Sequence, residues 1–308
     1  MDPASAYHAP VLASEVVELL RGSKRVLDGT LGGGGHALAL LNAGVHTVVG
    51  LDRDPDALAA AAVRLADYAR AGRLVALEAN FAAVDEIPAL ACDRFDGILL
   101  DLGVSSHQFD DESRGFTFRP GARLDMRMQP NGPDAASLLN DTPERELGSI
   151  FREFGDEPRS ARLAREIVRR RETRPFATSD DLVGAIRAVL GPRSGTAEFA
   201  RLFQAVRIAV NEELPGLARA LPVLRDRLEP GGILVAIAYH SGEDRLVKHA
   251  FREWSAACVC PPKQPVCTCR GQPLGETLTR RARTASADEV VQNPRARSAR
   301  LRAWRSVA

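Results

Sequence analysis

Short apolar runs alternate with helical stretches over the first hundred residues. The runs read as strands at Arg25–Leu27, His46–Leu51, Leu74–Leu77 and Phe95–Leu100. Alanine- and leucine-rich segments follow the first two runs, and Pro55 stands where proline favours the first position of a helix. Strands that alternate with helices predict a parallel sheet whose faces are covered.

This alternation stops after the fourth run. Between about residues 109 and 199 the pattern is helical or irregular, with helices expected at Glu144–Phe154, Arg159–Arg171 and Asp180–Val189. A long amphipathic helix is expected from Leu202 towards Ala220. The stretch therefore reads as a helical insertion.

Strand patterns return near the end of the chain. Ile233–Ala238 is apolar throughout, which is typical of a buried parallel strand. In Ala299–Arg305 apolar and polar residues alternate, which predicts a half-buried antiparallel strand. We therefore expect one discontinuous α/β domain, residues 1–108 and 200–308, and a helical insertion at residues 109–199 after the fourth strand.

Composition indicates a soluble globular protein of 308 residues, 45% hydrophobic and 26% charged, with a net charge of +1. Affinity for a polyanion must therefore come from local clusters of charge. No apolar stretch approaches the roughly 20 residues that span a bilayer. The first eight residues lack the pattern of a secretory signal, so we expect a cytoplasmic protein without membrane contact.

Glycines and aspartates stand where the predicted strands end. The first strand leads into Leu31-Gly-Gly-Gly-Gly-His36, the second ends at Asp52 and the fourth at Asp101. Open α/β sheets bind ligands at the carboxyl ends of their strands. A glycine loop lets backbone approach a nucleotide, and a carboxylate after the second strand can accept both ribose hydroxyls. The alternative is a glycine turn with solvated aspartates.

The choice of nucleotide cofactor leaves a second alternative. Gly32, Gly34 and Ala37 satisfy G-x-G-x-x-A, so a nicotinamide dehydrogenase is a rival interpretation. The helical insertion takes the place of a second mononucleotide-binding half, and the antiparallel end is typical of class I methyltransferase sheets. Both features favour a methyltransferase.

Several longer motifs resemble one family, the bacterial 16S rRNA cytidine N4-methyltransferases, called MraW or RsmH. The matching segments span nearly the whole chain: His8-Ala-Pro-Val-Leu12, Asp101-Leu-Gly-Val-Ser-Ser106 with Gln108, Leu124-Asp-Met-Arg-Met128, Phe203–Leu214, Tyr239-His-Ser241, Glu243-Asp-Arg245 and Asn293-Pro-Arg-Ala-Arg-Ser298. The chain departs from the family pattern at Tyr239 (usually Phe), Gly242 (usually Leu) and Gln129 (usually acidic).

The resemblance implies a class I, Rossmann-like methyltransferase sheet and methyl transfer from S-adenosyl-L-methionine. The acceptor would be the exocyclic amine of a cytidine in the decoding region of 16S rRNA, in the small ribosomal subunit. Carried over by motif, the cofactor-binding residues are Gly34, Gly35, His36, Asp52, Phe81, Asp101 and Gln108. The alternative function is a non-catalytic nucleotide-binding module for RNA or ribosome assembly.

Amine chemistry singles out two candidate catalytic residues. The cytosine amine is conjugated with its ring, so an acceptor for its protons helps to localise the lone pair. Asp101 is the acid at the place where exocyclic-amine methyltransferases keep such an acceptor. His240, after the fifth strand, is a candidate second polar contact or proton relay, or else a histidine satisfied by backbone.

Two arginine clusters are candidate RNA contacts. In the insertion, Arg162, Arg165 and Arg169 share one helix face, and a second set lies between Arg280 and Arg305. Arginine suits phosphate because its planar fork donates two parallel hydrogen bonds. The alternative is a solvated basic face.

Four of the five cysteines lie close together, as Cys258-x-Cys260 and Cys267-x-Cys269. Four thiols can ligate zinc, but C-x-C is less usual than C-x-x-C, and prolines separate the pairs. The preferred interpretation is reduced cysteines in a surface loop without a metal. The pattern decides neither this nor the oligomeric state.

Overall fold

The computed structural model describes residues 10–105, 108, 111–261, 264 and 266–307. The chain divides into two compact units. The larger unit comprises Met1–Gly103 and Leu214–Ala308, and the smaller one comprises Val104–Glu213. The boundary that we expected between residues 199 and 200 falls instead after Glu213, because helix α10 (Thr196–Val210) contributes to the core of the smaller unit. The first boundary falls after Gly103 rather than after residue 108.

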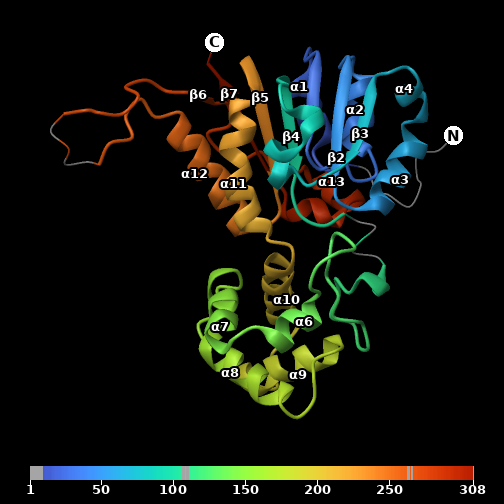
Figure 1. The fold of residues 1–308 in the computed structure, drawn as a ribbon, viewed down its shortest axis with the longest axis vertical. Helices are drawn as coiled ribbons and strands as arrows, with labels where there is room; N and C mark the ends of the chain where they lie inside the picture. Colours follow the sequence, from blue (N-terminus) through green and yellow to red (C-terminus); the bar gives the residue numbers. More distant parts are fainter. Residues whose placement is uncertain (1–9, 106–107, 109–110, 262–263, 265, 308) are drawn as a thin grey trace. The chain divides into compact units, whose positions relative to one another are not determined.

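A seven-stranded sheet in the order β3-β2-β1-β4-β5-β7-β6 forms the centre of the larger unit (Figure 1). Strands β1 to β5 are parallel, and β7 runs antiparallel to its neighbours β5 and β6. The strands are β1 Arg25–Asp28, β2 Thr47–Asp52, β3 Leu74–Glu78, β4 Phe95–Asp101, β5 Leu228–Ala238, β6 Gly275–Thr277 and β7 Arg300–Ser306. This arrangement confirms the predicted class I methyltransferase sheet.

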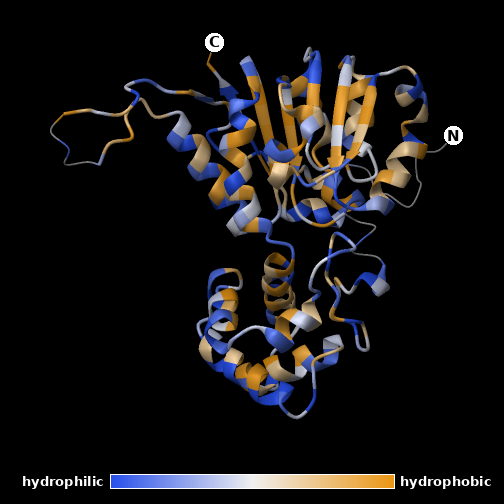
Figure 2. Ribbon diagram, viewed as in Figure 1, coloured by the Kyte–Doolittle hydropathy of each residue, from blue (hydrophilic) through white to orange (hydrophobic). Residues whose placement is uncertain are grey.

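Helices cover both faces of the sheet, whose strands are mostly hydrophobic, as their orange colour in Figure 2 shows. Successive side chains of a strand enter opposite cores: Val26 joins the core with α1 and α2, and Leu27 joins the core with α11 and α12. The helical elements of this unit are α1 Ala13–Leu20, α2 Gly35–Asn42, α3 Pro55–Arg64, α4 Ala66–Arg70, η1 Phe81–Glu86, η2 Pro88–Leu90, α11 Glu213–Asp226, α12 Ser241–Trp254, α13 Ala287–Gln292 and η4 Pro294–Ser298.

Strand β7 is buried on both faces, so the prediction of a half-buried strand was wrong. Arg302 is 8% exposed because its guanidinium donates to Asp244 of α12, at 2.6 and 3.2 Å. Trp304 is fully buried and packs edge-on against Trp254, with ring centroids 5.2 Å apart. An ion pair and an aromatic cluster therefore replace the solvent that we expected on this face.

The smaller unit is helical, as predicted. It contains η3 Glu112–Arg114, α6 Ala135–Asp141, α7 Glu144–Glu153, α8 Ser160–Arg171, α9 Ser179–Leu190 and α10 Thr196–Val210. Its own core includes Leu147 and Phe151 from α7, Leu163 and Ile167 from α8, and Leu202 from α10. A separate core of this kind is what defines a compact unit.

The long helix expected from Leu202 to Ala220 is broken between α10 and α11. Glu212 has a φ of 49°, in the left-handed region, which ends α10. The preceding residue, Asn211, donates its side-chain amide to Met126 O (2.7 Å) and accepts from Met128 N (2.8 Å). These bonds to a loop of the smaller unit stabilise the break, a long-range effect that local periodicity does not reveal.

Among the helices of the described ranges, none is both long enough and apolar enough to cross a membrane.

Candidate active site

The loop between β1 and α2 requires glycine. Gly34, which caps α2, has a φ of 77°, and Gly32 has a φ of 52°. A Cβ atom at Gly34 would lie 2.7 Å from Leu65 Cδ1, so a larger residue would displace Leu65 as well as strain the left-handed backbone. Gly35 is the first residue of α2. The loop therefore presents backbone, without side chains, at the start of a helix.

Asp52 joins the end of β2 to this loop. Its Oδ2 accepts a hydrogen bond from Gly32 N (2.7 Å) and its Oδ1 accepts one from Asp54 N (2.9 Å). Burial raises the pKa of Asp52. Each carboxylate oxygen has a further lone pair, so Asp52 can still accept hydrogen bonds from a ligand.

Asp101 is held from three directions at the end of β4. Its backbone N–H donates to Thr30 Oγ1 (2.6 Å), just beyond β1. Its Oδ1 accepts from the Tyr239 hydroxyl (2.8 Å), and its Oδ2 lies 3.3 Å from His36 Nε2. Residues that follow β1 and β5, together with α2, thus fix one carboxylate.

His36 lies between two acids in a buried position. Burial by itself would lower the pKa of His36, but Asp101 and then Asp28 outweigh it, so the pKa of His36 is raised. Asp28 is fully buried, and burial raises its pKa to about 6. Within the described residues, His36 Nδ1 and Asp28 Oδ2 have no hydrogen-bond partner. Buried polar atoms without partners, beside a glycine loop, fit a site that binds a polar ligand.

Phe81 and Gln108 were expected to complete the cofactor site. Phe81 begins η1 and is partly buried against the core beneath it. A Cβ atom at Gly29 would lie 3.2 Å from Phe81 Cβ, so glycine permits this close approach. Gln108 is buried in the smaller unit, where its Oε1 accepts from Ser105 N (3.0 Å). The role of both residues toward the cofactor stays a prediction.

His240 caps α12, and Glu243 is its neighbour. His240 Nε2 lies 3.1 Å from Glu243 Oε1, and Glu243 Oε2 accepts from the backbone N–H of Tyr239 (2.8 Å). The residue after β5 that contacts Asp101 is therefore Tyr239. Sequence reasoning missed Tyr239 and Thr30 as partners of Asp101, although both follow strands at their carboxyl ends.

The arginine face of α8 is exposed, as the helical spacing predicts. Arg165 is 74% exposed and lies 3.5 Å from Glu144, whereas Arg169 is 66% exposed and pairs with Glu166 at 2.8 Å. Arg162 is also exposed. Partial neutralisation by these glutamates reduces the positive charge of the face, but it leaves the guanidinium groups accessible.

Comparisons with known proteins agree with this arrangement. A model of the MraW methylase family matches residues 5–307. Ribosomal RNA small subunit methyltransferase H of Gemmatimonas aurantiaca is 66% identical over 301 residues, which cover 97% of this chain and 95% of that protein. The protein of the same name from Heliobacterium mobile is 46% identical, over 96% of this chain and 97% of its own length. The one from Anaeromyxobacter sp. strain K is 48% identical, over 96% of each chain.

A match of this extent decides between the two interpretations of the glycine loop. The nicotinamide dehydrogenase interpretation is wrong, and the antiparallel β7 agrees with that outcome. The chain belongs to the MraW methylase family.

Proposed function

We propose that this methylase transfers the methyl group of S-adenosylmethionine to the N4 amine of a cytidine in the decoding region of 16S rRNA. The observation that carries the proposal is 66% identity, across 97% of the chain, to a protein named as a small-subunit ribosomal RNA methyltransferase. The half-buried acid at the end of β4, Asp101, supplies the matching chemistry.

The cofactor pocket is assigned to residues at the carboxyl ends of β1, β2 and β4. Asp52 would accept the ribose hydroxyls, and the backbone of Gly34 and Gly35 would lie against the amino-acid part of the cofactor. His36 has a buried nitrogen without a partner among the described residues, and this nitrogen can bind a polar group of that ligand. By family resemblance, Phe81 would also bind the cofactor, and Gln108 is a further candidate cofactor-binding residue. The bound cofactor supplies an electrophilic methyl group.

Asp101 would act on the amine. Its two oxygens have lone pairs beyond those directed at Tyr239 and His36, so it can also accept an N4 proton. This contact draws the nitrogen lone pair out of conjugation and aligns it for transfer. After the methyl group has moved, the surplus amine proton passes to the carboxylate, whose charge His36 has stabilised.

His240 remains the second catalytic candidate. Its imidazole lies against Glu243, an acid–base pair that can relay a proton away from the site. Tyr239 contacts Asp101, whereas His240 lies against Glu243, so His240 would act through solvent or through substrate rather than by contact with Asp101.

The exposed arginines of α8 are assigned to the RNA backbone. Arg162, Arg165 and Arg169 present three guanidinium groups from one helix face. Phosphate contacts of this kind position an RNA without reading its sequence. The target base must be unstacked to reach a pocket, which a single-stranded rRNA segment allows. With such a substrate, we expect the enzyme to act in the cytoplasm.

One experiment tests the reaction against the alternative of a non-catalytic assembly module. Small subunits that lack the modification are incubated with the enzyme and with labelled S-adenosylmethionine. The label should appear in N4-methylated cytidine at one position of the decoding region. Binding to the subunits without consumption of the cofactor would support the assembly module, and label on another nucleoside would exclude the proposed acceptor.

A further inference from the structure

The segment between α12 and β6 contains almost no apolar core. Among its described residues from Ser255 to Leu274, none is buried, and Val259 and Val266 are 41% and 70% exposed. The base of the segment is fixed, because Leu274 N donates to Trp254 O at 2.8 Å. Beyond this base, the segment must be ordered by something other than apolar packing.

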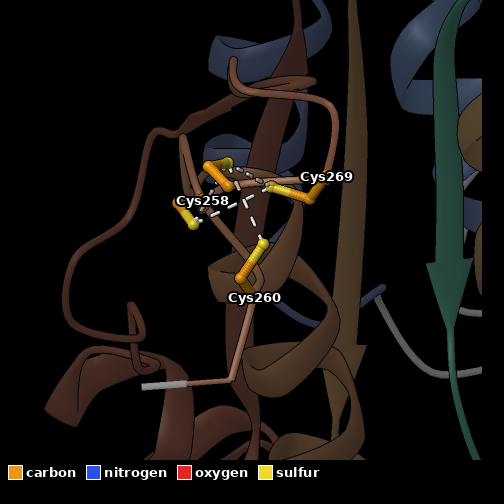
Figure 3. A group of neighbouring side chains, drawn as sticks. Cys258, Cys260 and Cys269 are labelled. Carbon is orange, nitrogen blue, oxygen red and sulfur yellow. Dashed lines mark hydrogen bonds between the residues drawn. The ribbon is translucent and has the colours of Figure 1, made fainter. Parts of the chain in front are cut away.

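The four cysteines of this segment converge at its far end. Cys258, Cys260 and Cys269 point toward a common centre in Figure 3. The Sγ–Sγ separations are 3.8 Å for Cys258–Cys267, 3.9 Å for Cys260–Cys267, 3.4 Å for Cys267–Cys269 and 3.8 Å for Cys258–Cys269. All four sulfur atoms lie within 4.8 Å of one another.

These separations have the size of the edges of a metal–sulfur tetrahedron. Four sulfurs at about 2.3 Å from a zinc ion are about 3.8 Å apart. A disulfide would instead bring two sulfurs to about 2.05 Å, and all four cysteines are free. The sulfurs are thus too far apart for disulfides and close enough to share one ion.

Backbone hydrogen bonding also favours thiolate at this place. Val259 N lies 3.4 Å from Cys269 Sγ and donates to it. A backbone N–H that donates to sulfur stabilises the negative charge that a metal ligand carries. The two C-x-C pairs thus supply both the geometry and the charge of a tetrahedral site.

We propose that Cys258, Cys260, Cys267 and Cys269 bind one structural Zn²⁺ ion. Four protein ligands close the coordination sphere, and the ligating thiols release their protons to solvent on binding. This proposal departs from the preferred interpretation of the sequence, in which these cysteines form a surface loop without a metal. The site is separate from Asp101, because the 14-residue helix α12, about 20 Å long, runs between Tyr239 and the cysteine segment.

Metal analysis of the full chain tests the proposal. Protein purified without chelator should contain about one zinc per chain. The double variant Cys258→Ser/Cys267→Ser, which removes one ligand from each pair, should lose it. Cys92→Ser is the matched control, because Cys92 is an exposed free cysteine in another segment, and it should retain the zinc.

Cobalt provides a readout of geometry that does not depend on activity. Metal-free enzyme, prepared with chelator and reductant, should take up one Co²⁺ and show the absorption of a tetrahedral thiolate complex. Zinc should displace that ion. Wild-type protein without metal, iron in place of zinc, disulfides found by mass spectrometry without reductant, or zinc retained by the double variant would each overturn the proposal.

Discussion

The hydroxyl of Tyr239 donates a 2.8 Å hydrogen bond to Oδ1 of Asp101. Burial and the charge of Asp101 raise the pKa of Tyr239 well above its ordinary value, so the phenol keeps its proton and stays a donor. With His36 on the other carboxylate oxygen, the two side chains fix the plane of the Asp101 carboxylate. Tyr239 is therefore a positioning residue for the proposed acceptor of the amine.

Replacement of Tyr239 with Phe tests this role. The variant keeps the ring, and Phe is the residue that the resembling family usually has, so we expect it to fold normally. Loss of one hydrogen bond to the carboxylate should reduce turnover by about threefold to tenfold at saturating cofactor. Cofactor affinity, measured by calorimetry, should be unchanged. Wild-type turnover would show that His36 and Thr30 position Asp101 without help.

Replacement of Asp101 with Asn separates catalysis from binding. The variant preserves the shape and one acceptor oxygen but removes the negative charge that attracts the amine proton. We expect single-turnover methylation to fall by about a hundredfold or more, the usual scale for a positioned acid–base group. Affinity for S-adenosylmethionine should change much less. A near-normal single-turnover rate would mean that Asp101 only binds the cofactor.

Replacement of Asp52 with Ala should weaken cofactor binding. The variant loses the proposed bonds to the ribose and also the acceptor for Gly32 N, which holds the glycine loop. At roughly 1.5–3 kcal/mol for a hydrogen bond to a charged group, affinity should fall by at least about tenfold. Glu78→Ala is the matched control, because Glu78 pairs with Asp52 in the sheet register but is exposed. Equal affinity of the two variants by calorimetry would contradict the assignment.

Removal of the arginine face of α8 should weaken binding of RNA. In the triple variant Arg162→Ala/Arg165→Ala/Arg169→Ala we expect lower affinity and a flatter dependence on salt, by about 0.7 in slope for each lost phosphate contact. Cofactor binding should not change.

A control triple variant removes the same charge elsewhere. Exposed arginines of the larger unit, Arg21, Arg70 and Arg252, are each changed to Ala. Fluorescence titrations at several salt concentrations compare the two variants. Equal losses in both would indicate a general effect of charge rather than a contact at α8.

Replacement of Asp28 with Asn should change how stability depends on pH. The pKa of buried Asp28 is about 6, above its ordinary value of 3.8, so the folded state retains a proton that the unfolded state releases. The contribution of Asp28 to the free energy of unfolding is fully present below about pH 4 and is lost as the pH rises through about 6. At pH 7 the ionised Asp28 lowers the free energy of unfolding of the cofactor-free enzyme by at most about 3 kcal/mol.

The Asn variant avoids that cost and keeps an acceptor for Thr30 N. Its free energy of unfolding should exceed that of the wild type at pH 7, and the difference should shrink toward pH 4. Urea unfolding at several pH values measures both proteins. A difference that does not vary with pH would show that Asp28 does not titrate in this range.

Local pattern was sufficient for the features that depend on neighbouring residues. The apolar runs predicted β1, β2, β4 and β5 because a strand buried on both faces reads as apolar throughout. Strand β3 at the sheet edge was predicted from the same kind of run, although most of its residues are exposed. The places of the glycine loop, Asp52 and Asp101 at the carboxyl ends of β1, β2 and β4 were predictable from the same runs, and their role toward a ligand stays a prediction. Helices α7, α8 and α9 followed from their periodicity, whereas α6 was not predicted and α10 begins before the expected start at Leu202.

The features that were missed depend on partners far away in the sequence. Arg302 is buried because Asp244 neutralises it, and α10 ends where Asn211 bonds to Met126 and Met128. The bond from Tyr239 to Asp101 joins strand ends that lie on opposite sides of the insertion in the sequence. Spacing along the chain contains no signal for such contacts, whereas the tertiary fold determines them.

The strand order has a consequence for the path by which the chain folds. β4 pairs with β5, yet the whole of Val104–Glu213 is synthesised between them, so the centre of the sheet closes by a contact of very long range. The smaller unit has its own core and contacts of shorter range, which form faster because less loop entropy is lost. The helical unit should therefore acquire structure before the centre of the sheet does, and pairing of β4 with β5 becomes the slow step of folding.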